Sequence, residues 1–176
     1  MTLAIGEEAP NFQLPDTEGA SWTSPDGAAA PVTVVVFTCN HCPYALAWHD
    51  RIAQAARDYA DRGVRFLAIN ANDPERYPRD SYEAMQQRVA NEDWPMPYLH
   101  DETQEVAHAF GAKTTPDVFV IDSGGRVRYR GAPDSDYDDP SENAAWLREA
   151  LDAVLAGQEP SRPETKPVGC SIKWKG

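Results

Sequence analysis

A buried strand that runs into two cysteines is the feature that most restricts the fold of this 176-residue chain. Residues 32–37 read VTVVVF, an almost wholly apolar and β-branched run that is typical of a strand buried on both faces. Segment 43–60 repeats apolar residues at helical spacing and opens with Pro43, which suits the first turn of a helix. A second apolar strand follows at 64–69, so the order predicts a β-α-β unit with two parallel strands and a right-handed crossover.

The remaining elements turn from parallel to antiparallel pairing towards the end of the chain. Short strands are predicted at 12–14, 21–23, 117–122 and 127–130. Helices are predicted at 81–91, at 102–110 and from a cap at Ser141 to about 156. Loops are predicted at 24–31 and 70–78. Three prolines predict an extended segment over 157–176. The sequence therefore predicts an α/β domain over 1–156, with a central mixed β-sheet flanked by helices and an N-terminal β-hairpin, and an extended tail over 157–176 that carries Cys170.

The charge of the chain argues against two classes of partner. It carries 28 acidic and 16 basic residues, a formal net charge of -12, so a nucleic acid backbone or an anionic lipid surface would repel it. No apolar run approaches the roughly 18–20 residues that a bilayer crossing needs, and the first residues show no secretory signal. We therefore expect a cytoplasmic protein that binds neither nucleic acid nor membrane.

Cysteines are the residues that carry chemistry in this sequence. Cys39 and Cys42 form a C-x-x-C motif at the junction between the predicted strand and helix, and Cys170 lies in the tail. Two cysteines at this spacing lie on one face of a helix N-terminus, where unpaired N–H groups and the helix dipole stabilise a thiolate. The thiolate is the form that attacks a disulfide. The pair therefore indicates a redox site first and half of a zinc or copper site second.

Four stretches of the sequence resemble the thioredoxin-fold superfamily. They are the opening Ile5–Leu14, the motif Cys39-Asn-His-Cys-Pro-Tyr44, the Thr114-Thr115-Pro116 that precedes the predicted hairpin, and the late Gly169-Cys-Ser-Ile-Lys-Trp174. Within that superfamily the sequence is similar to the redoxin branch, which includes the AhpC/TSA-type peroxiredoxins and the TlpA-like thiol-disulfide oxidoreductases, and to a peroxiredoxin-like group in it. The resemblance covers nearly the whole chain and implies a thioredoxin-like fold.

The resemblance also implies roles for the site residues. Cys39 would be the exposed attacking sulfur, Cys42 the more buried sulfur that resolves the mixed disulfide, and His41 would tune the redox potential of the pair. Thr115-Pro116 matches the cis-proline loop that faces the two cysteines across a substrate groove. The implied function is a thiol-disulfide oxidoreductase that acts on protein or small-molecule disulfides, is recycled by an electron-donating reductase, and uses neither a cofactor nor a metal.

One departure from the family concerns the proton acceptor. Thioredoxins place a buried acid on the strand that leads to the first cysteine, but residues 32–37 contain no carboxylate. The proton of Cys42 must then go to another group. We expect that group to be His41, a water molecule or an acid from elsewhere in the chain, such as Asp73.

A second departure, from the peroxiredoxin pattern, makes a thiol peroxidase an alternative function and not the main expectation. A thiol peroxidase would reduce hydroperoxides through a cysteine sulfenic acid. The peroxiredoxin pattern has Thr or Ser three residues before the reacting cysteine, whereas this chain has Val36 before Cys39 and Cys39 before Cys42. A thioredoxin-fold protein that holds zinc or copper is the second alternative.

Several other conspicuous residues receive structural interpretations. Cys170 is a third redox cysteine that resolves or shields the pair, a small buried residue that anchors the tail with Ile172 and Trp174, or a cysteine that forms an intermolecular disulfide. We expect packing roles for Trp48, His49, Tyr59 and Trp94. The acidic run of Asp134, Asp136, Asp138 and Asp139 is expected to form a solvated loop. His100 and His108 are expected at ordinary surface or half-buried positions.

Overall fold

A five-stranded mixed sheet forms the centre of the molecule in the computed structural model, which describes residues 1–24 and 32–176. The strand order is β5-β4-β3-β7-β8, with β3 at Val32–Phe37, β4 at Val64–Asn70, β5 at Tyr98–His100, β7 at Asp117–Asp122 and β8 at Val127–Gly131. β3 runs parallel to β4 and antiparallel to β7, and β7 pairs with β8 in a hairpin. The predicted mixed sheet and its β-α-β unit are therefore confirmed.

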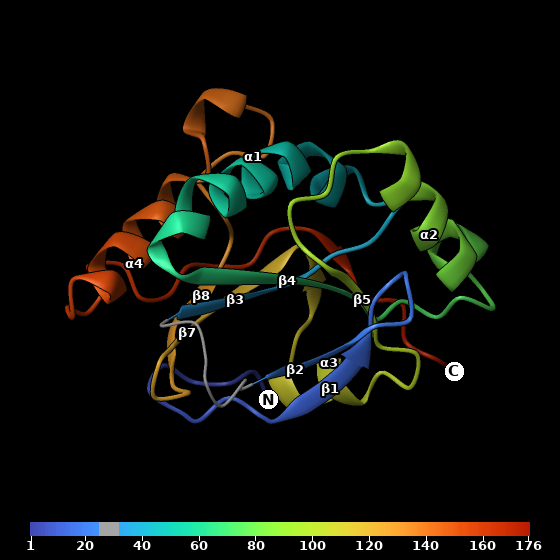
Figure 1. Ribbon diagram of the computed structural model, residues 1–176, viewed down its shortest axis with the longest axis horizontal. Helices are drawn as coiled ribbons and strands as arrows, with labels where there is room; N and C mark the ends of the chain where they lie inside the picture. Colours follow the sequence, from blue (N-terminus) through green and yellow to red (C-terminus); the bar gives the residue numbers. More distant parts are fainter. Residues whose placement is uncertain (25–31) are drawn as a thin grey trace.

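Helices cover one face of this sheet, and a helix and a hairpin cover the other (Figure 1). On the first face lie α1 at Pro43–Tyr59, α2 at Tyr82–Asn91 and α4 at Ala145–Leu155; on the second lie α3 at Glu105–Phe110 and the hairpin of β1 at Phe12–Pro15 and β2 at Ser21–Ser24. Each face has its own apolar core, because the alternate side chains of β3 point in opposite directions. Val34 packs with Trp48 on one side, and Phe37 packs with Phe110 on the other. No helix in the described ranges has the length and apolar character that a bilayer crossing requires.

The large side chains of α1 pack as the sequence predicts. Trp48, His49 and Tyr59 are buried, and Trp48 and Tyr59 belong to the core under α1 and α4. Trp94 is half-buried and stacks on Tyr98, with ring centroids 4.3 Å apart. The packing interpretation of these residues is confirmed.

The last helix begins later than the sequence predicts. Ser141 lies in the 3-10 turn η3 at Pro140–Glu142, where its hydroxyl and its N–H both donate to the Asp139 carboxylate. A cap hydroxyl must accept from the helix it caps. Asn143 and Ala144 then adopt left-handed backbone conformations, and α4 starts at Ala145.

Three short strands escaped the sequence analysis. β5 has three residues, while β6 at Thr114–Thr115 and β9 at Cys170–Ser171 have two each and pair with one another. Runs this short show no measurable alternation of apolar and polar residues, so periodicity cannot find them. The predicted loop at 24–31 falls outside the described residues except for Ser24, which ends β2.

One residue of the acidic run ties α1 to the segment before α4. Asp134 is buried, and its carboxylate accepts from Arg51 Nη1 at 3.0 and 3.1 Å, from Trp48 Nε1 at 2.8 Å and from the N–H of Ala144 at 2.9 Å. The prediction of a solvated loop is wrong for Asp134, because the buried Arg51 guanidinium needs a counter-charge. The other three acidic residues of the run are exposed or half-buried, as expected.

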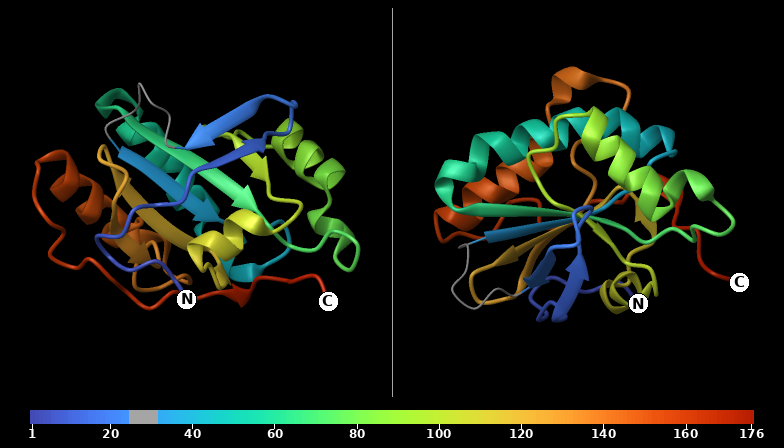
Figure 2. Two further views of the ribbon diagram at one scale, coloured as in Figure 1. Left: turned by 90° about the horizontal axis from the view of Figure 1, so that it is seen from below. Right: turned by 45° about the vertical axis from the view of Figure 1, so that its right-hand side comes forward.

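The segment after α4 is extended, as predicted, and returns along the sheet (Figure 2). Arg130 and Glu164 form an ion pair at 3.0 Å, and the N–H of Thr165 donates to the Arg130 carbonyl at 3.0 Å. The chain then reaches β9, which adds to β6 as an antiparallel partner. The tail is therefore attached to the sheet by backbone hydrogen bonds and not only by side-chain contacts.

A buried carboxyl at the start of β7 should make stability depend on pH. Burial raises the pKa of Asp117 from 3.8 to about 7, against hydrogen bonds from the N–H groups of Lys113 and Thr114. The folded protein then binds more protons than the unfolded chain between these two pH values, so the free energy of unfolding falls as pH rises from about 4 to about 7. At about 1.4 kcal/mol per pH unit, this residue accounts for a fall of about 4 kcal/mol.

Urea unfolding at several pH values would measure this effect. In the Asp117→Asn protein, we expect the fall between pH 4 and 7 to shrink by about that amount, since an amide cannot ionise. Asp138→Asn, an exposed change, should retain the wild-type slope. Equal slopes in the wild type and the Asp117→Asn variant would contradict the assignment.

Candidate active site

The two cysteines of the C-x-x-C motif lie where β3 ends and α1 begins. Cys39 follows β3 after a single residue, and Cys42 is the N-cap of α1, immediately before Pro43. Proline fits this first helical position because it has no N–H that would need a partner inside the helix. Both cysteines, like Cys170, are free thiols.

Both sulfur-bearing residues are buried. Cys39 is 1% exposed and Cys42 is 0% exposed, so the prediction of an exposed Cys39 is wrong. The reason is that other parts of the chain cover the motif: Tyr44 and Cys170 pack against it, and Thr115 lies over it. A substrate can reach the Cys39 sulfur only when one of these neighbours moves.

The loop before β7 faces the two cysteines, as the sequence predicts. The Thr115-Pro116 bond is cis, which confirms the predicted isomer. The Cys42 thiol donates to the Thr115 carbonyl at 3.3 Å, and the Cys39 sulfur lies 3.4 Å from the Thr115 hydroxyl. One residue thus contacts both sulfurs of the motif.

The third cysteine joins the same cluster. Cys170 stands opposite Thr115 in the β6–β9 pairing and packs against the cluster of Cys39, Cys42 and Ala45. The tail therefore brings a third thiol to the motif. Cys170 is half-buried and lies near the pair, as the redox interpretation from the sequence expects.

The surroundings of the two cysteines favour ionisation of Cys42 over Cys39. The interaction with Cys39 lowers the pKa of Cys42 well below its usual range, with further help from Cys170 and from the N–H of Ala45 in the first turn of α1. The pKa of Cys39 is raised by the same interaction with Cys42, by burial and by the nearby Asp80 carboxylate. Cys42 is therefore the first of the two thiols to ionise.

A buried carboxylate lies beside the motif, although no acid stands on the strand that leads to it. Asp80 is fully buried and accepts from the N–H of Asn40 at 2.6 Å and from the side chains of Asn70 and Asn72 at 3.1 and 3.0 Å. His41 Nδ1 pairs with Asp80 Oδ2, the oxygen that also accepts from Asn72. Asp80 ends the 3-10 turn η2 at Pro78–Asp80, and nothing in the local sequence marks it as a site residue.

Asp73, the acid named from the sequence, has a different role. Its carboxylate accepts from the N–H of Glu75 at 3.0 Å and lies 3.9 Å from Arg76, while its own N–H donates to the carbonyl of Lys173 at 2.8 Å. Asp73 therefore does not lie at the motif as the expected acid. Asp80 takes that position, because the segment after β4 directs Asp80 and not Asp73 toward the motif.

Residues from α2 and β5 hold Cys39 and Asn40 in place. Arg88 Nη1 donates to the Cys39 carbonyl and to Asn40 Oδ1, both at 3.1 Å, and the Tyr98 hydroxyl donates to the same Asn40 oxygen at 2.7 Å. The sequence analysis missed both Arg88 and Tyr98. Their partners lie tens of residues away in the chain, so no local spacing could have revealed them.

One set of side chains in the described part of the chain has the donor atoms to hold a metal ion. The ligand atoms of Cys39, His41 and Asp80 lie within 4.8 Å of one another. A structural zinc site has four protein ligands, and a catalytic zinc site has three and a water. The same trio also suits proton transfer, since it joins a thiol, an imidazole and a carboxylate.

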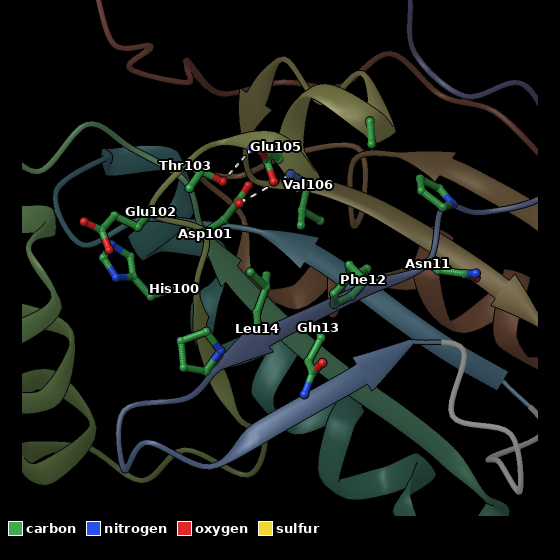
Figure 3. A pocket seen from close by; sticks show the side chains of 13 residues that line it. Asn11, Phe12, Gln13, Leu14, His100, Asp101, Glu102, Thr103, Glu105 and Val106 are labelled. Carbon is green, nitrogen blue, oxygen red and sulfur yellow. Dashed lines mark hydrogen bonds between the residues drawn. The ribbon is translucent and has the colours of Figure 1, made fainter.

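The remaining histidines lie away from the cysteines. His100 is buried rather than half-buried and packs on Tyr82, with ring centroids 5.5 Å apart. It lines a cleft of about 480 Å³ between β1 and the segment 100–106, which none of the three cysteines lines (Figure 3). His108 is exposed and stacks on Trp174 at 4.2 Å.

Known proteins resemble this chain over most of its length. A thiol-disulfide oxidoreductase ResA from Geobacillus thermodenitrificans is 26% identical over 128 residues, which cover 72% of this chain and 68% of that protein. The crystal structure of an uncharacterised conserved protein from Geobacillus kaustophilus is 39% identical, covers 98% of this chain and 93% of its own, and has a TM-score of 0.92. A hypothetical protein from Sinorhizobium meliloti 1021 is 34% identical, with coverages of 100% and 97% and a TM-score of 0.94.

More distant structures and a family model complete the comparison. DsbE-like and thioredoxin-like solved structures of 21% and 24% identity share the fold at TM-scores of 0.69 and 0.67, which confirms the predicted thioredoxin-like fold. The model of the AhpC/TSA family matches residues 5–130, which include β3, the C-x-x-C motif and the hairpin of β7 and β8. The chain therefore belongs to the AhpC/TSA family.

Proposed function

We propose that this protein is a thiol-disulfide oxidoreductase in which Cys39 and Cys42 exchange electrons with a protein or small-molecule disulfide. One observation carries the proposal: two free thiols at the N-terminus of α1 both contact Thr115, the residue before the cis-proline. The lowered pKa of Cys42 favours the thiolate, which is the form that takes part in disulfide exchange. The similarity to a protein named as a thiol-disulfide oxidoreductase supports the same activity.

The first step transfers one half of the substrate to Cys39. Cys39 passes its proton to Cys42 along the hydrogen bond that joins them, and its thiolate attacks a sulfur of the substrate R–S–S–R′. The bond between the two substrate sulfurs breaks, R′S⁻ leaves, and a mixed disulfide forms between Cys39 and R. The departing R′S⁻ takes the proton from Cys42 and becomes R′SH, so Cys42 is again a thiolate.

The second step closes the internal disulfide. The Cys42 thiolate attacks the Cys39 sulfur, RS⁻ leaves, and the protein has lost two electrons to the substrate. A dithiol reductase then restores the pair by the reverse exchange. His41, which Asp80 holds near Cys39, is a second group that can accept the Cys39 proton.

Intact-mass analysis after thiol trapping tests the proposal. The reduced full chain is exposed to hydroxyethyl disulfide, quenched with an alkylating agent and compared with an untreated sample. We expect the untreated protein, alkylated under denaturing conditions, to carry three alkyl groups and the treated protein to carry one, because one disulfide has formed. Three alkyl groups after treatment would overturn the proposal.

A parallel exposure to hydrogen peroxide separates the alternatives. Faster oxidation by peroxide than by the disulfide, with a sulfenic acid captured by dimedone, would assign the peroxidase function instead. A protein that keeps three free thiols under both oxidants, and copurifies with stoichiometric zinc or copper, would assign the metal-binding function. In the proposed oxidoreductase, the small disulfide reacts first.

A further inference from the structure

The tail places a third thiol beside the redox pair by a defined strand pairing. β9 adds to β6 so that Cys170 stands opposite Thr115, whose carbonyl accepts from the Cys42 thiol at 3.3 Å. Cys170 also packs directly against the cluster of Cys39, Cys42 and Ala45. The tail thiol therefore lies beside the two cysteines of the motif.

The position of Cys170 is fixed on both sides. Before it, a Cβ on Gly169 would lie 2.2 Å from the Thr115 carbonyl oxygen, so only glycine allows β9 to approach β6 this closely. After it, the N–H of Ile172 donates to the Lys113 carbonyl at 3.0 Å, and the Ile172 side chain is buried.

The residues beyond Ile172 are anchored as firmly. The N–H of Lys173 donates to Asn72 Oδ1 at 2.9 Å, and its carbonyl accepts from the side chain of Gln104 at 2.9 Å. The N–H of Lys175 donates back to Gln104 Oε1 at 3.0 Å. A chain held in this way does not place its cysteine beside Cys42 by chance contact.

β9 also occupies the edge that an incoming strand would use. An extended peptide binds a sheet edge by backbone hydrogen bonds, and the β6 edge next to the sulfurs already has a partner. Cys170 thus takes the place that a cysteine of such a peptide would take. The geometry gives Cys42 two possible disulfide partners within the same molecule.

We propose that Cys170 is a third redox residue, which forms a disulfide with Cys42 in the oxidised protein and leaves Cys39 as a free thiol. This inference rests on the proposed function. The Cys170 thiolate attacks the Cys42 sulfur of the Cys39–Cys42 disulfide, the bond to Cys39 breaks, and Cys39 leaves as a thiolate that takes up the proton lost by Cys170. One disulfide replaces another, so no electrons enter or leave the protein.

The timing of this step follows from charge. Burial and the neighbouring Cys42 together raise the pKa of Cys170 to about 11, which keeps it a thiol while the pair is reduced. Once Cys42 is part of a disulfide, its negative charge is gone, and Cys170 ionises more easily. Oxidation of the pair therefore makes Cys170 more reactive, while burial, the larger cause of its raised pKa, remains.

Tryptic mapping distinguishes the two disulfides without reduction. Trypsin cuts after Lys and Arg but not before Pro, so Cys39 and Cys42 fall together on fragment 1–51 and Cys170 falls on fragment 149–173. A Cys39–Cys42 disulfide leaves the two fragments separate, whereas a Cys42–Cys170 disulfide links them. We expect the linked fragments from the full chain after oxidation by hydroxyethyl disulfide, in a yield that does not change on dilution.

Two variants identify the sulfurs and control for proximity. Cys39→Ser should still give the linked fragments, but more slowly, because Cys42 must then attack the reagent itself before Cys170 displaces the mixed disulfide. The double variant Cys170→Ser/Ser171→Cys keeps three thiols but moves one of them to the other face of β9, since neighbouring strand residues point to opposite faces. In that protein we expect the linkage to be lost, while the Cys39–Cys42 disulfide still forms.

The outcomes separate this inference from the proposed function. If fragment 1–51 carries its own disulfide and no linked fragments appear in the wild type or in Cys39→Ser, the inference fails and the proposed function stands. Equal linkage in the double variant would also overturn the inference, because it would show that any tail cysteine can react. If all thiols stay free, the proposed function itself has failed.

Discussion

Replacing Cys39 or Cys42 with serine should reduce the rate of disulfide reduction on the order of a thousandfold or more, to the background of the reductant alone. A serine hydroxyl is not ionised near neutral pH, so it can neither attack a disulfide nor resolve a mixed one. The measurement is the reduction of insulin by dithiothreitol with each variant present at equal concentration. Ser171→Ala, an exposed change beside Cys170, should retain wild-type activity.

The two serine variants should differ in what they trap. With Cys42→Ser, a mixed disulfide forms on Cys39 and has no partner in the motif to resolve it, so it accumulates and appears as added substrate mass. With Cys39→Ser, the first attack is lost and no such adduct forms on that residue. An adduct on Cys42 in the Cys39→Ser protein, together with none on Cys39 in the other variant, would reverse the assignment of the two roles.

The second large effect concerns stability rather than activity. Asp134→Ala removes the carboxylate that accepts from Arg51, Trp48 and the N–H of Ala144, and it leaves the Arg51 guanidinium buried without a counter-charge. Breaking a buried ion pair in this way costs about 3–5 kcal/mol of the free energy of unfolding. For a chain of this size, the melting temperature should fall by about 10 °C.

Matched variants make the source of that loss visible. Asp138→Ala removes an exposed carboxylate from the same acidic run and should change the free energy of unfolding by less than about 0.5 kcal/mol. Arg51→Met/Asp134→Leu should recover much of the stability lost in Asp134→Ala, because an apolar pair leaves no unpaired charge in the core. If Asp134→Ala unfolds at the same urea concentration as the wild type, the buried pair contributes nothing.

Local sequence patterns were sufficient to predict the elements whose residues are contiguous in the chain, including the strand and helix that carry the C-x-x-C motif. The apolar run of β3, the C-x-x-C motif and the apolar spacing along α1 are contiguous, so one stretch of sequence contains the whole strand–motif–helix unit. The hairpin of β7 and β8 is marked in the same way by a glycine-containing turn. Each of these elements shows its pattern within its own residues, even though β3 pairs with the distant β7.

The rest of the site depends on contacts between distant residues. Asp80 reaches the motif from a short turn, and Cys170 reaches it through a strand of two residues, so neither leaves a periodic signal. Asp134 could not be separated from its acidic neighbours, because its burial depends on Arg51 in another element. Burial of Cys39 likewise depends on the tail, which the sequence predicts to be extended but does not position.

The strand pairing of Cys170 limits which length changes the tail can tolerate. Surface segments outside regular structure usually accept insertions and deletions. Here the pairing of Thr165 with Arg130 and of Ile172 with Lys113 fixes both ends of the stretch that contains Gly169 and Cys170. Deleting one residue between these anchors would shift the register of β9, bring the Ser171 hydroxyl to the position of the thiol, and place the Cys170 side chain where the backbone contact permits only a hydrogen. Substitutions outside the two strands should therefore be far easier to accumulate in this tail than any change in its length.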